Sequence, residues 1–142
     1  PDTDFVKRVV ALAGDTVRVS GDTLFVNDEP SPLGSMYQDP FSNNVIDDDW
    51  PGCLPRLQGR VPHLALSLLE RNVIRDSSGN AAYVVPDGHV FMMGDNRDHS
   101  SDSRIWGPLD EGLIKGKALV IYWSWVPGGG LPNLSRITML VR

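Results

Sequence analysis

The chain has 142 residues, 41% of them hydrophobic, and a formal net charge of −5 at pH 7. This length is enough for one domain with a hydrophobic core, and no run approaches the ~20 consecutive apolar residues of a membrane-spanning helix, so composition predicts a soluble globular piece. The scattered Lys and Arg argue against a nucleic-acid partner, and the lone Cys53 excludes an internal disulfide and a cysteine-rich zinc site.

The N-terminal part of the chain predicts short strands joined by tight turns. Residues 5–13 are rich in valine and end at Gly14-Asp15, which is typical of a strand. Thr16–Ser20 and Thr23–Val26 alternate apolar and polar residues around Gly21-Asp22, and this pattern predicts a β-hairpin.

Residues 31–80 differ from the rest of the chain in composition. Prolines, glycines and the acidic run Asp47-Asp48-Asp49 indicate a long loop or an insertion. Within this segment, residues 62–71 form either a short helix or an irregular strand, and periodicity does not separate the two. We therefore predict a single domain with a core at about 1–30 and 81–142 and an inserted loop-rich subdomain at about 31–80.

The C-terminal half again has the composition of strands. Residues 81–85 and His89–Met93 are separated by the turn residues Pro86-Asp87-Gly88, and two further strands are predicted at 117–125 and 136–141. Many short strands, tight turns and little helix predict a mostly β domain.

A polar stretch at residues 94–108 follows the strand that ends at Met93. It contains charges of both signs, amide and imidazole groups, and several hydroxyls. Asp and Arg at short spacing can form charge-assisted hydrogen bonds that hold a backbone rigid beside a site, although an ordinary polar loop is a competing interpretation. A calcium site is a third interpretation, weakened by interleaved arginines and the lack of an EF-hand pattern; its ligands would be Asp95, Asp98 and Asp102.

The strand predicted at residues 5–13 carries two adjacent cations, Lys7 and Arg8. Strict alternation places them on opposite faces, and both faces are apolar, so one cation is expected to lie against hydrophobic surface. Lysine suits a chemical role better, because burial lowers the pKa of an amine and leaves it able to take a proton, which arginine cannot do. The alternative is a strand-edge lysine that deters aggregation.

The histidines do not indicate a metal site or a conventional triad. His63, His89 and His99 lack metal-ligand spacing. His99 is adjacent to Ser100, and neighbouring side chains of an extended chain point to opposite faces, so a Ser-His-Asp site has little support.

Taken together, these stretches resemble the conserved boxes of bacterial type I signal peptidases, the serine peptidases of family S26. Residues 5–15 are similar to the family's lysine box, residues 93–108 to its Gly-Asp-Asn-Arg-Asp box, and residues 114–125 to its C-terminal strand. The resemblance spans the chain and is weakest at 31–80, where a long insertion is similar to that of the Gram-negative enzymes. It implies antiparallel sheets and a partly open barrel of the signal-peptidase (LexA-like) type.

The resemblance assigns roles to residues of both boxes. Lys7 matches the general base, which deprotonates the nucleophilic serine and later the attacking water, and Ser100 matches the hydroxyl that orients this lysine. Asp102 and Arg104 match an ion pair that braces the site. The residues expected to help shape the site are Asp95, Asn96 and Arg97.

The resemblance also implies a nucleophile that these residues do not include. The family carries it in a Ser-Met pair before the lysine strand, after one or more membrane helices, so the serine is expected upstream of Pro1, and the fragment itself is expected to be inactive. Gly34-Ser35-Met36 is superficially similar but follows the lysine strand, and we interpret it as part of the insertion. Two departures from the family, Ile105 for tyrosine and His99 for asparagine, are expected to tolerate change.

The function implied by the resemblance is that of a serine endopeptidase with a Ser/Lys dyad. Such an enzyme removes signal peptides from exported preproteins after small residues, uses no cofactor, and is anchored in the bacterial inner membrane with its catalytic domain facing the periplasm or exterior. One alternative is a related Ser/Lys peptidase of the conjugative-pilus processing or self-cleaving repressor type. Another is an inactive peptide-binding module, and an upstream Ser-Met motif would discriminate against it.

Overall fold

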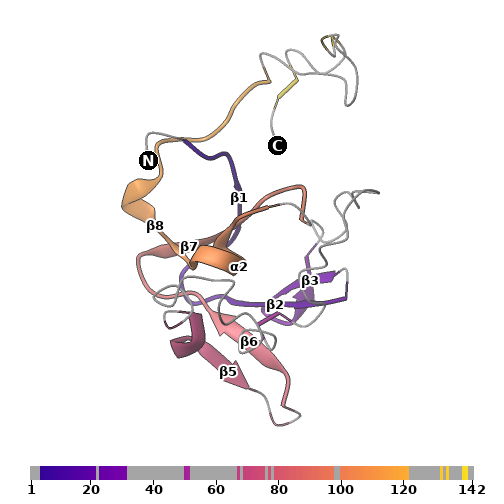
Figure 1. The fold of residues 1–142 in the computed structure, drawn as a ribbon, viewed down its shortest axis with the longest axis vertical. Coiled ribbons are helices and arrows are strands. Elements are labelled where there is room, and N and C mark those ends of the chain that lie inside the picture. The colour runs from indigo at the N-terminus through magenta and orange to yellow at the C-terminus, as the bar shows by residue number, and fades with distance from the viewer. Residues whose placement is uncertain are drawn as a thin grey trace.

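The computed structural model describes residues 4–21, 23–31, 50–51, 67, 69–75, 77, 79–97, 100–121, 132, 134 and 139–140. These residues form two antiparallel sheets with few helices, and the described strands close no barrel (Figure 1). The prediction of a mostly β, antiparallel domain is confirmed.

The smaller sheet has three strands in the order β1-β7-β8. They are β1 (Arg8–Ala11), β7 (His89–Met93) and β8 (Leu109–Asp110). The larger sheet has five strands in the order β4-β3-β2-β6-β5. They are β2 (Thr16–Ser20), β3 (Thr23–Val26), β4 (Glu29–Pro30), β5 (Val73–Arg75) and β6 (Ala81–Val84). Two short helical segments, α2 (Ser103–Trp106) and the 3₁₀-helix η2 (Glu111–Leu113), flank β8 in the chain.

The predicted hairpin at the start of the larger sheet is confirmed. β2 and β3 pair from Val17 opposite Val26 to Ser20 opposite Thr23. Gly21 at the turn has a positive φ of 55°, which glycine adopts without steric cost.

β1 is shorter than predicted and is irregular. It spans Arg8–Ala11 rather than 5–13, and its pairing with β7 shifts register between Val9 and Ala11. The bulge ends the strict alternation expected from the sequence: Ala11 is buried, and its neighbour Val10 also packs against the core. The predicted alternation of faces is therefore wrong beyond Val9, because an extra residue in a ladder reverses the faces that follow it.

The core contains a cluster of three aromatic rings. Trp50, Tyr83 and Phe91 lie with ring centroids 5.1 to 5.7 Å apart, in tilted arrangements. Tyr83 belongs to the larger sheet and Phe91 to the smaller one, so the cluster packs the two sheets together. This packing sets the position of β7, the strand that leads into the polar stretch.

The segment at 31–80 contributes to this core, although most of it lies outside the described residues. Trp50 and Leu69 are buried, and β5 pairs with β6, with Val73 opposite Tyr83. The described residues 67 and 69–71 are helical, which favours the helix over the strand for this part of the chain. The division into a core and an inserted subdomain stays a prediction.

The chain crosses between the two sheets at Pro86-Asp87-Gly88. β6 pairs with β2 and β5, whereas β7 pairs with β1 and β8, so these consecutive strands do not form a hairpin. The β1–β2 connection is held beside this crossover, because Gly14 N donates to Val85 O at 2.9 Å and Val85 N donates to Asp15 O at 2.9 Å.

The two predicted C-terminal strands are described only in part. Val120 pairs antiparallel with Leu140, and Ile121 N donates to Met139 O at 2.9 Å; the rest of 117–125 and 136–141 lies outside the described residues. None of the helical segments that the structure describes has the length and apolar content of a membrane span.

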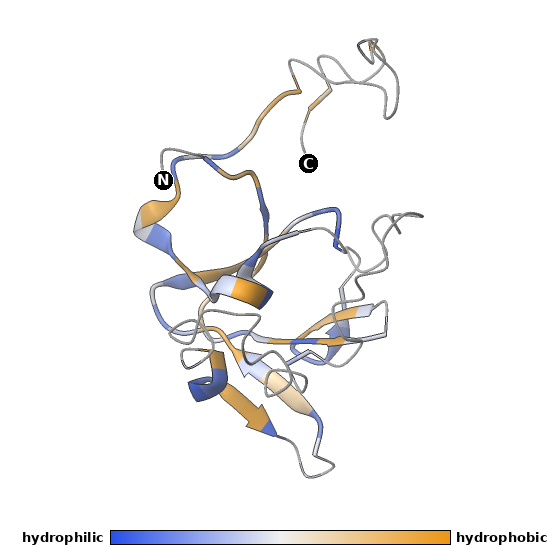
Figure 2. Ribbon diagram, viewed as in Figure 1, coloured by the Kyte–Doolittle hydropathy of each residue, from blue (hydrophilic) through white to orange (hydrophobic). Residues whose placement is uncertain are grey.

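Two segments, one around β1 and one after β8 in the chain, carry exposed apolar side chains. The ribbon of both segments includes stretches in the hydrophobic colour in Figure 2. The first comprises Phe5, Val6, Val9 and Leu12, and the second comprises Leu113, Ile114, Leu119 and Val120. An ion pair between Lys115 and Asp4 joins the two segments, with Nζ 2.5 Å from Oδ1. The two apolar segments are thus neighbours at this point of the surface.

Candidate active site

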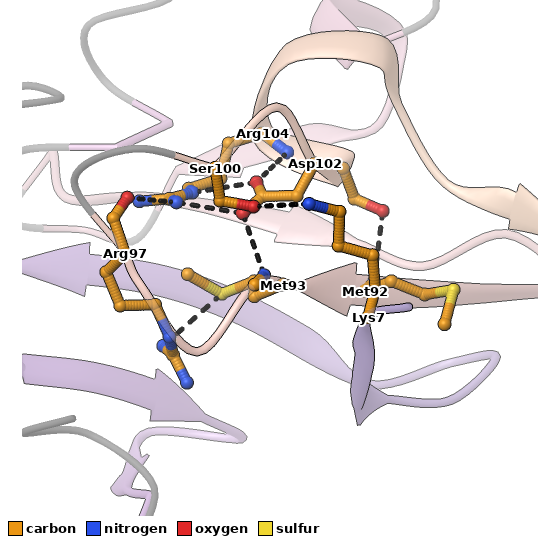
Figure 3. A network of polar contacts seen from close by, with 9 residues as sticks. Lys7, Met92, Met93, Arg97, Ser100, Asp102 and Arg104 are labelled. Atoms are coloured by element: carbon orange, nitrogen blue, oxygen red, sulfur yellow. Dashed lines mark hydrogen bonds and ion pairs between the residues drawn. The ribbon is translucent and has the colours of Figure 1, made fainter. Parts of the chain in front are cut away.

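The site forms where the segment before β1 meets the loop after β7. Arg8 lies opposite Met93 in the ladder, so Lys7 and Gly94 lie side by side at the end of the paired region. Lys7 Nζ donates to Ser100 Oγ at 2.9 Å, across 93 residues of sequence (Figure 3). An amine within hydrogen-bonding distance of a buried hydroxyl is a geometry that suits proton transfer or the orientation of a base.

Gly94 allows this contact because it has no side chain. A Cβ added at Gly94 would lie 2.2 Å from Ser100 Oγ, 2.6 Å from Ser100 Cβ and 3.5 Å from Lys7 Nζ. These distances to Ser100 are far below van der Waals contact. The Gly94 backbone also contributes a bond, since its N–H donates to Asp102 Oδ2 at 3.0 Å.

A buried ion pair lies beside the Lys7–Ser100 contact. Arg104 Nε donates to Asp102 Oδ1 and Arg104 Nη2 to Asp102 Oδ2, each at 2.9 Å, and the two side chains are 5% and 0% exposed. Asp102 also caps α2 by accepting from Arg104 N at 3.2 Å. Arg104 Nη2 donates further to Arg97 O at 2.6 Å, so this pair holds the backbone of the loop that carries Ser100.

The Asp102 carboxylate is stabilised in its ionised form despite complete burial. Burial raises the pKa of Asp102, but the hydrogen bonds and charge of Arg104, the Gly94 N–H and the Ser100 hydroxyl together lower the pKa below its ordinary value. A charge held in this way is a source of stability that depends on pH.

We expect the stability of the chain to decline in acid through Asp102. Because its folded pKa lies below the unfolded value of about 3.9, its contribution is complete above that value and is lost as the pH falls through the folded pKa. The gap in free energy of unfolding between wild type and Asp102→Asn should therefore narrow from about pH 5 to pH 2. Urea unfolding of both proteins across this pH range measures the difference in free energy of unfolding. A difference that does not change with pH would contradict a lowered pKa of Asp102.

A second ion pair, which the sequence analysis missed, joins β1 to the loop. Arg8 donates from Nε to Asp95 Oδ1 at 2.8 Å and from Nη2 to Asp95 Oδ2 at 2.9 Å. The hydrogen bond from Arg8 is the main reason that the pKa of Asp95 is lowered. No local pattern relates Arg8 to Asp95, because only the β1–β7 register brings them together.

Ser103 is a further contact that the sequence did not indicate. Its Oγ accepts from Met92 N at 2.9 Å and so attaches α2 to β7. The bulge in β1 falls opposite this part of β7, where the ladder is irregular. The bond from Met92 to Ser103 and the bond from Gly94 to Asp102 therefore hold the first turn of α2 against the end of β7.

The structure brings four of the predicted site residues into one group: Lys7, Ser100, Asp102 and Arg104. Asp95 lies at its edge in the pair with Arg8, and Asn96 is half-buried with its Oδ1 unpaired. The Arg97 carbonyl faces Arg104, whereas its Nη1 donates to Met93 Sδ at 3.6 Å, away from Lys7 (Figure 3).

The remaining predictions concern a metal site and residues that the structure does not describe. Asp98, His99 and Gly34-Ser35-Met36 fall outside the described residues. The described residues contain no group of three His, Cys, Asp or Glu side chains suited to a metal ion. Asp102, a ligand of the alternative calcium site, is bonded to Arg104 and Gly94 through both of its oxygens.

Gly94→Ala is expected to disrupt the site. The new methyl group must displace Ser100, and we expect kcat/KM of the full-length protein to fall by about 10- to 100-fold, because misplacing a positioned group by about 1 Å can cost 100-fold. Gly116→Ala is the matched control, since a Cβ there meets nothing within 4 Å. An unchanged kcat/KM in Gly94→Ala would show that the close approach of Gly94 to Ser100 is not needed for activity.

Comparisons of the chain with known proteins point to one family. The family model described as signal peptidase, peptidase S26, matches residues 1–123. The signal peptidase I of Pseudomonas aeruginosa is 33% identical to this chain in an alignment 165 residues long. The alignment covers 99% of this chain and 51% of that protein. The signal peptidase I of Aquifex aeolicus is 30% identical in an alignment 162 residues long, which covers 95% of this chain and 61% of that protein.

The chain spans about half the length of its Pseudomonas relatives. A crystal structure of a signal peptidase I from Enterococcus faecalis V583 matches 78% of each chain at 24% identity with a TM-score of 0.41. With a TM-score this low, the fold assignment rests on the strand pairing described above.

Proposed function

This chain belongs to the signal peptidase family, peptidase S26, and on that premise we propose that the protein containing it is a serine endopeptidase that removes signal peptides from exported preproteins after small residues. The observation that carries the proposal is the 2.9 Å contact between Lys7 Nζ and Ser100 Oγ beside the buried Asp102–Arg104 pair. A lysine held in this way suits a general base that works without histidine.

Lys7 acts as the base in a two-step acyl transfer. Its amine takes the proton of the nucleophilic serine as the serine oxygen attacks the scissile carbonyl, and it then gives that proton to the departing amine of the mature protein. A water, deprotonated by Lys7 in turn, hydrolyses the acyl-enzyme and frees the signal peptide and the serine. The family resemblance implies that the nucleophilic serine precedes the lysine strand.

Cleavage of a preprotein by the full-length protein tests this function. The protein, expressed from its own start codon in detergent or lipid, is incubated with a preprotein whose signal peptide ends in an Ala-X-Ala sequence. We expect one cut after the final alanine, read from the masses of both products. A folded protein that binds the signal peptide and leaves it intact would favour the inactive peptide-binding module instead.

Ser100→Ala is expected to reduce activity less than removal of the lysine. Ser100 orients the base and does not accept the proton, so we expect kcat/KM to fall by about tenfold, below the roughly 100- to 10,000-fold contribution of a general base. The measurement is kcat/KM of Ser100→Ala and Lys7→Ala in the same full-length background. A loss at Ser100 as large as at Lys7 would indicate a direct chemical role for the hydroxyl.

We place the site next to a bacterial inner membrane, on the periplasmic or exterior side. The two neighbouring apolar segments around Phe5 and Leu113 support this location, because exposed apolar patches mark surfaces that meet a membrane or a partner. Asp4, one partner of the ion pair that joins them, lies three residues before Lys7 in the chain. A peptide emerging from the membrane would thus meet this surface close to the base.

A further inference from the structure

The two methionines at the end of β7 point to opposite faces of the smaller sheet and differ in exposure. Met93 is 1% exposed, and its Sδ accepts a hydrogen bond from Arg97 Nη1 at 3.6 Å. Met92 is half-buried. In Figure 3 the sulfur of Met93 lies toward Arg97, and the side chain of Met92 extends in the opposite direction. Of these two thioethers, that of Met92 is therefore the one that a small solute can reach.

Met92 shares its face of the sheet with Lys7. Met92 lies opposite Val9 in the ladder. Side chains directly opposite each other share a face, and so do residues two apart on one strand, so Lys7, Val9 and Met92 point to the same side. The position of Gly94, two residues after Met92, agrees with this, because a Cβ there would lie 3.5 Å from Lys7 Nζ. Lys7 and Met92 are thus diagonal neighbours, and long side chains reach across such a diagonal.

From this arrangement, and on the premise of the proposed function, we infer that Met92 is an oxidation site through which a peroxide lowers the activity of the enzyme. Hydrogen peroxide transfers one oxygen atom to Met92 Sδ: the O–O bond breaks, an S–O bond forms, the sulfur loses two electrons, and water leaves. A methionine sulfoxide reductase reverses the change, with two thiols supplying the electrons and forming a disulfide and water. The modification is therefore reversible.

The sulfoxide changes the surroundings of Lys7. A thioether is an apolar and adaptable neighbour, whereas a sulfoxide oxygen is polar and accepts hydrogen bonds. This new acceptor on the face of Lys7 competes with Ser100, whose Oγ accepts from Lys7 Nζ at 2.9 Å in the unmodified protein. Because misplacing a positioned group by about 1 Å can cost 100-fold, we expect oxidation of Met92 to lower kcat/KM by at least about tenfold.

Mild treatment of the full-length protein with hydrogen peroxide tests the inference. All proteins carry Cys53→Ser and Met36→Leu, so that these two side chains, which lie outside the described residues, cannot be oxidised in this way. Peptide mass spectrometry measures each sulfoxide, and preprotein cleavage is measured in the same samples as a fraction of the untreated activity. We expect activity to fall as the Met92 sulfoxide forms, and a methionine sulfoxide reductase to restore it.

Met92→Leu is the decisive variant, because it keeps an apolar side chain and removes the sulfur. It should retain most of its own untreated activity over the time in which the wild type is inactivated. Inactivation of Met92→Leu at the rate of the wild type would overturn the inference. So would a wild type that stays fully active after Met92 has been converted to the sulfoxide.

Met139→Leu is the matched control, since it makes the same change at a methionine that is 51% exposed and whose carbonyl accepts from Ile121 N. The Met139 sulfoxide should form first and the Met93 sulfoxide last, and Met139→Leu should lose activity as fast as the wild type. Protection by Met139→Leu equal to that by Met92→Leu would overturn the inference.

Two further measurements separate a local effect from general damage and from failure of the proposed function. The free energy of unfolding should be nearly the same before and after oxidation of Met92, because this side chain is only half-buried. A loss of stability large enough to unfold the protein would overturn the inference. If the untreated wild type cleaves the preprotein and Met92→Leu gives no protection, this inference alone fails; if the untreated wild type does not cleave, the proposed function fails and the inference with it.

Discussion

Replacing Lys7 by alanine in the full-length protein is expected to lower kcat/KM for preprotein cleavage by at least about 100-fold, because general base catalysis contributes on the order of 100- to 10,000-fold. Lys7 precedes β1 and is only half-buried, so its removal leaves the ladder and the aromatic core in place. Urea unfolding and far-ultraviolet circular dichroism should therefore match those of the wild type.

Lys115→Ala is the control for this experiment. It truncates a second lysine, whose side chain is 77% exposed in its pair with Asp4, and we expect activity close to that of the wild type. Retention of more than a few per cent of activity in Lys7→Ala would exclude Lys7 as the base. Loss of activity in both variants would instead indicate that the apolar surface near Asp4 and Lys115 matters for binding the substrate.

Arg104→Ala is expected to lower the free energy of unfolding by about 3–5 kcal/mol, because removing one partner of a buried ion pair leaves an uncompensated charge. Asp102 is 0% exposed and would keep only the Gly94 N–H, the N-cap bond and Ser100 as partners. Burial would then favour protonation of the carboxyl, and part of the lost stability should return at low pH.

Arg8→Ala provides the comparison, since the geometry of its pair is nearly the same. Arg8 and Asp95 are also joined by two N–O contacts, of 2.8 and 2.9 Å, but their side chains are 24% and 53% exposed. An ion pair in contact with solvent contributes about 0–1 kcal/mol, so Arg8→Ala should cost far less than Arg104→Ala. Equal losses in the free energy of unfolding, measured with urea, would show that burial does not distinguish the contributions of the two ion pairs.

Several elements of the fold could be predicted because their signals are local. The β2–β3 hairpin follows from alternation around Gly21-Asp22, and β7 has the same bounds in the sequence analysis and in the structure. The prediction for β1 failed at both ends and at its bulge, because the ladder with β7 decides where the strand is paired. Composition did not reveal that Trp50 belongs to the core, because its contacts come from two distant strands.

The sequence by itself determined the mostly β class, the family resemblance and the identity of the two chemical stretches, since turn residues, alternation and short motifs are properties of neighbouring residues. Only the tertiary structure decided which charges became buried and which polar groups met. Asp95 and Asp102 lie in one polar run, yet one is half-exposed beside Arg8 and the other is fully buried beneath Arg104. The physical reason is that burial and pairing depend on the register of β1 with β7 and on the docking of α2.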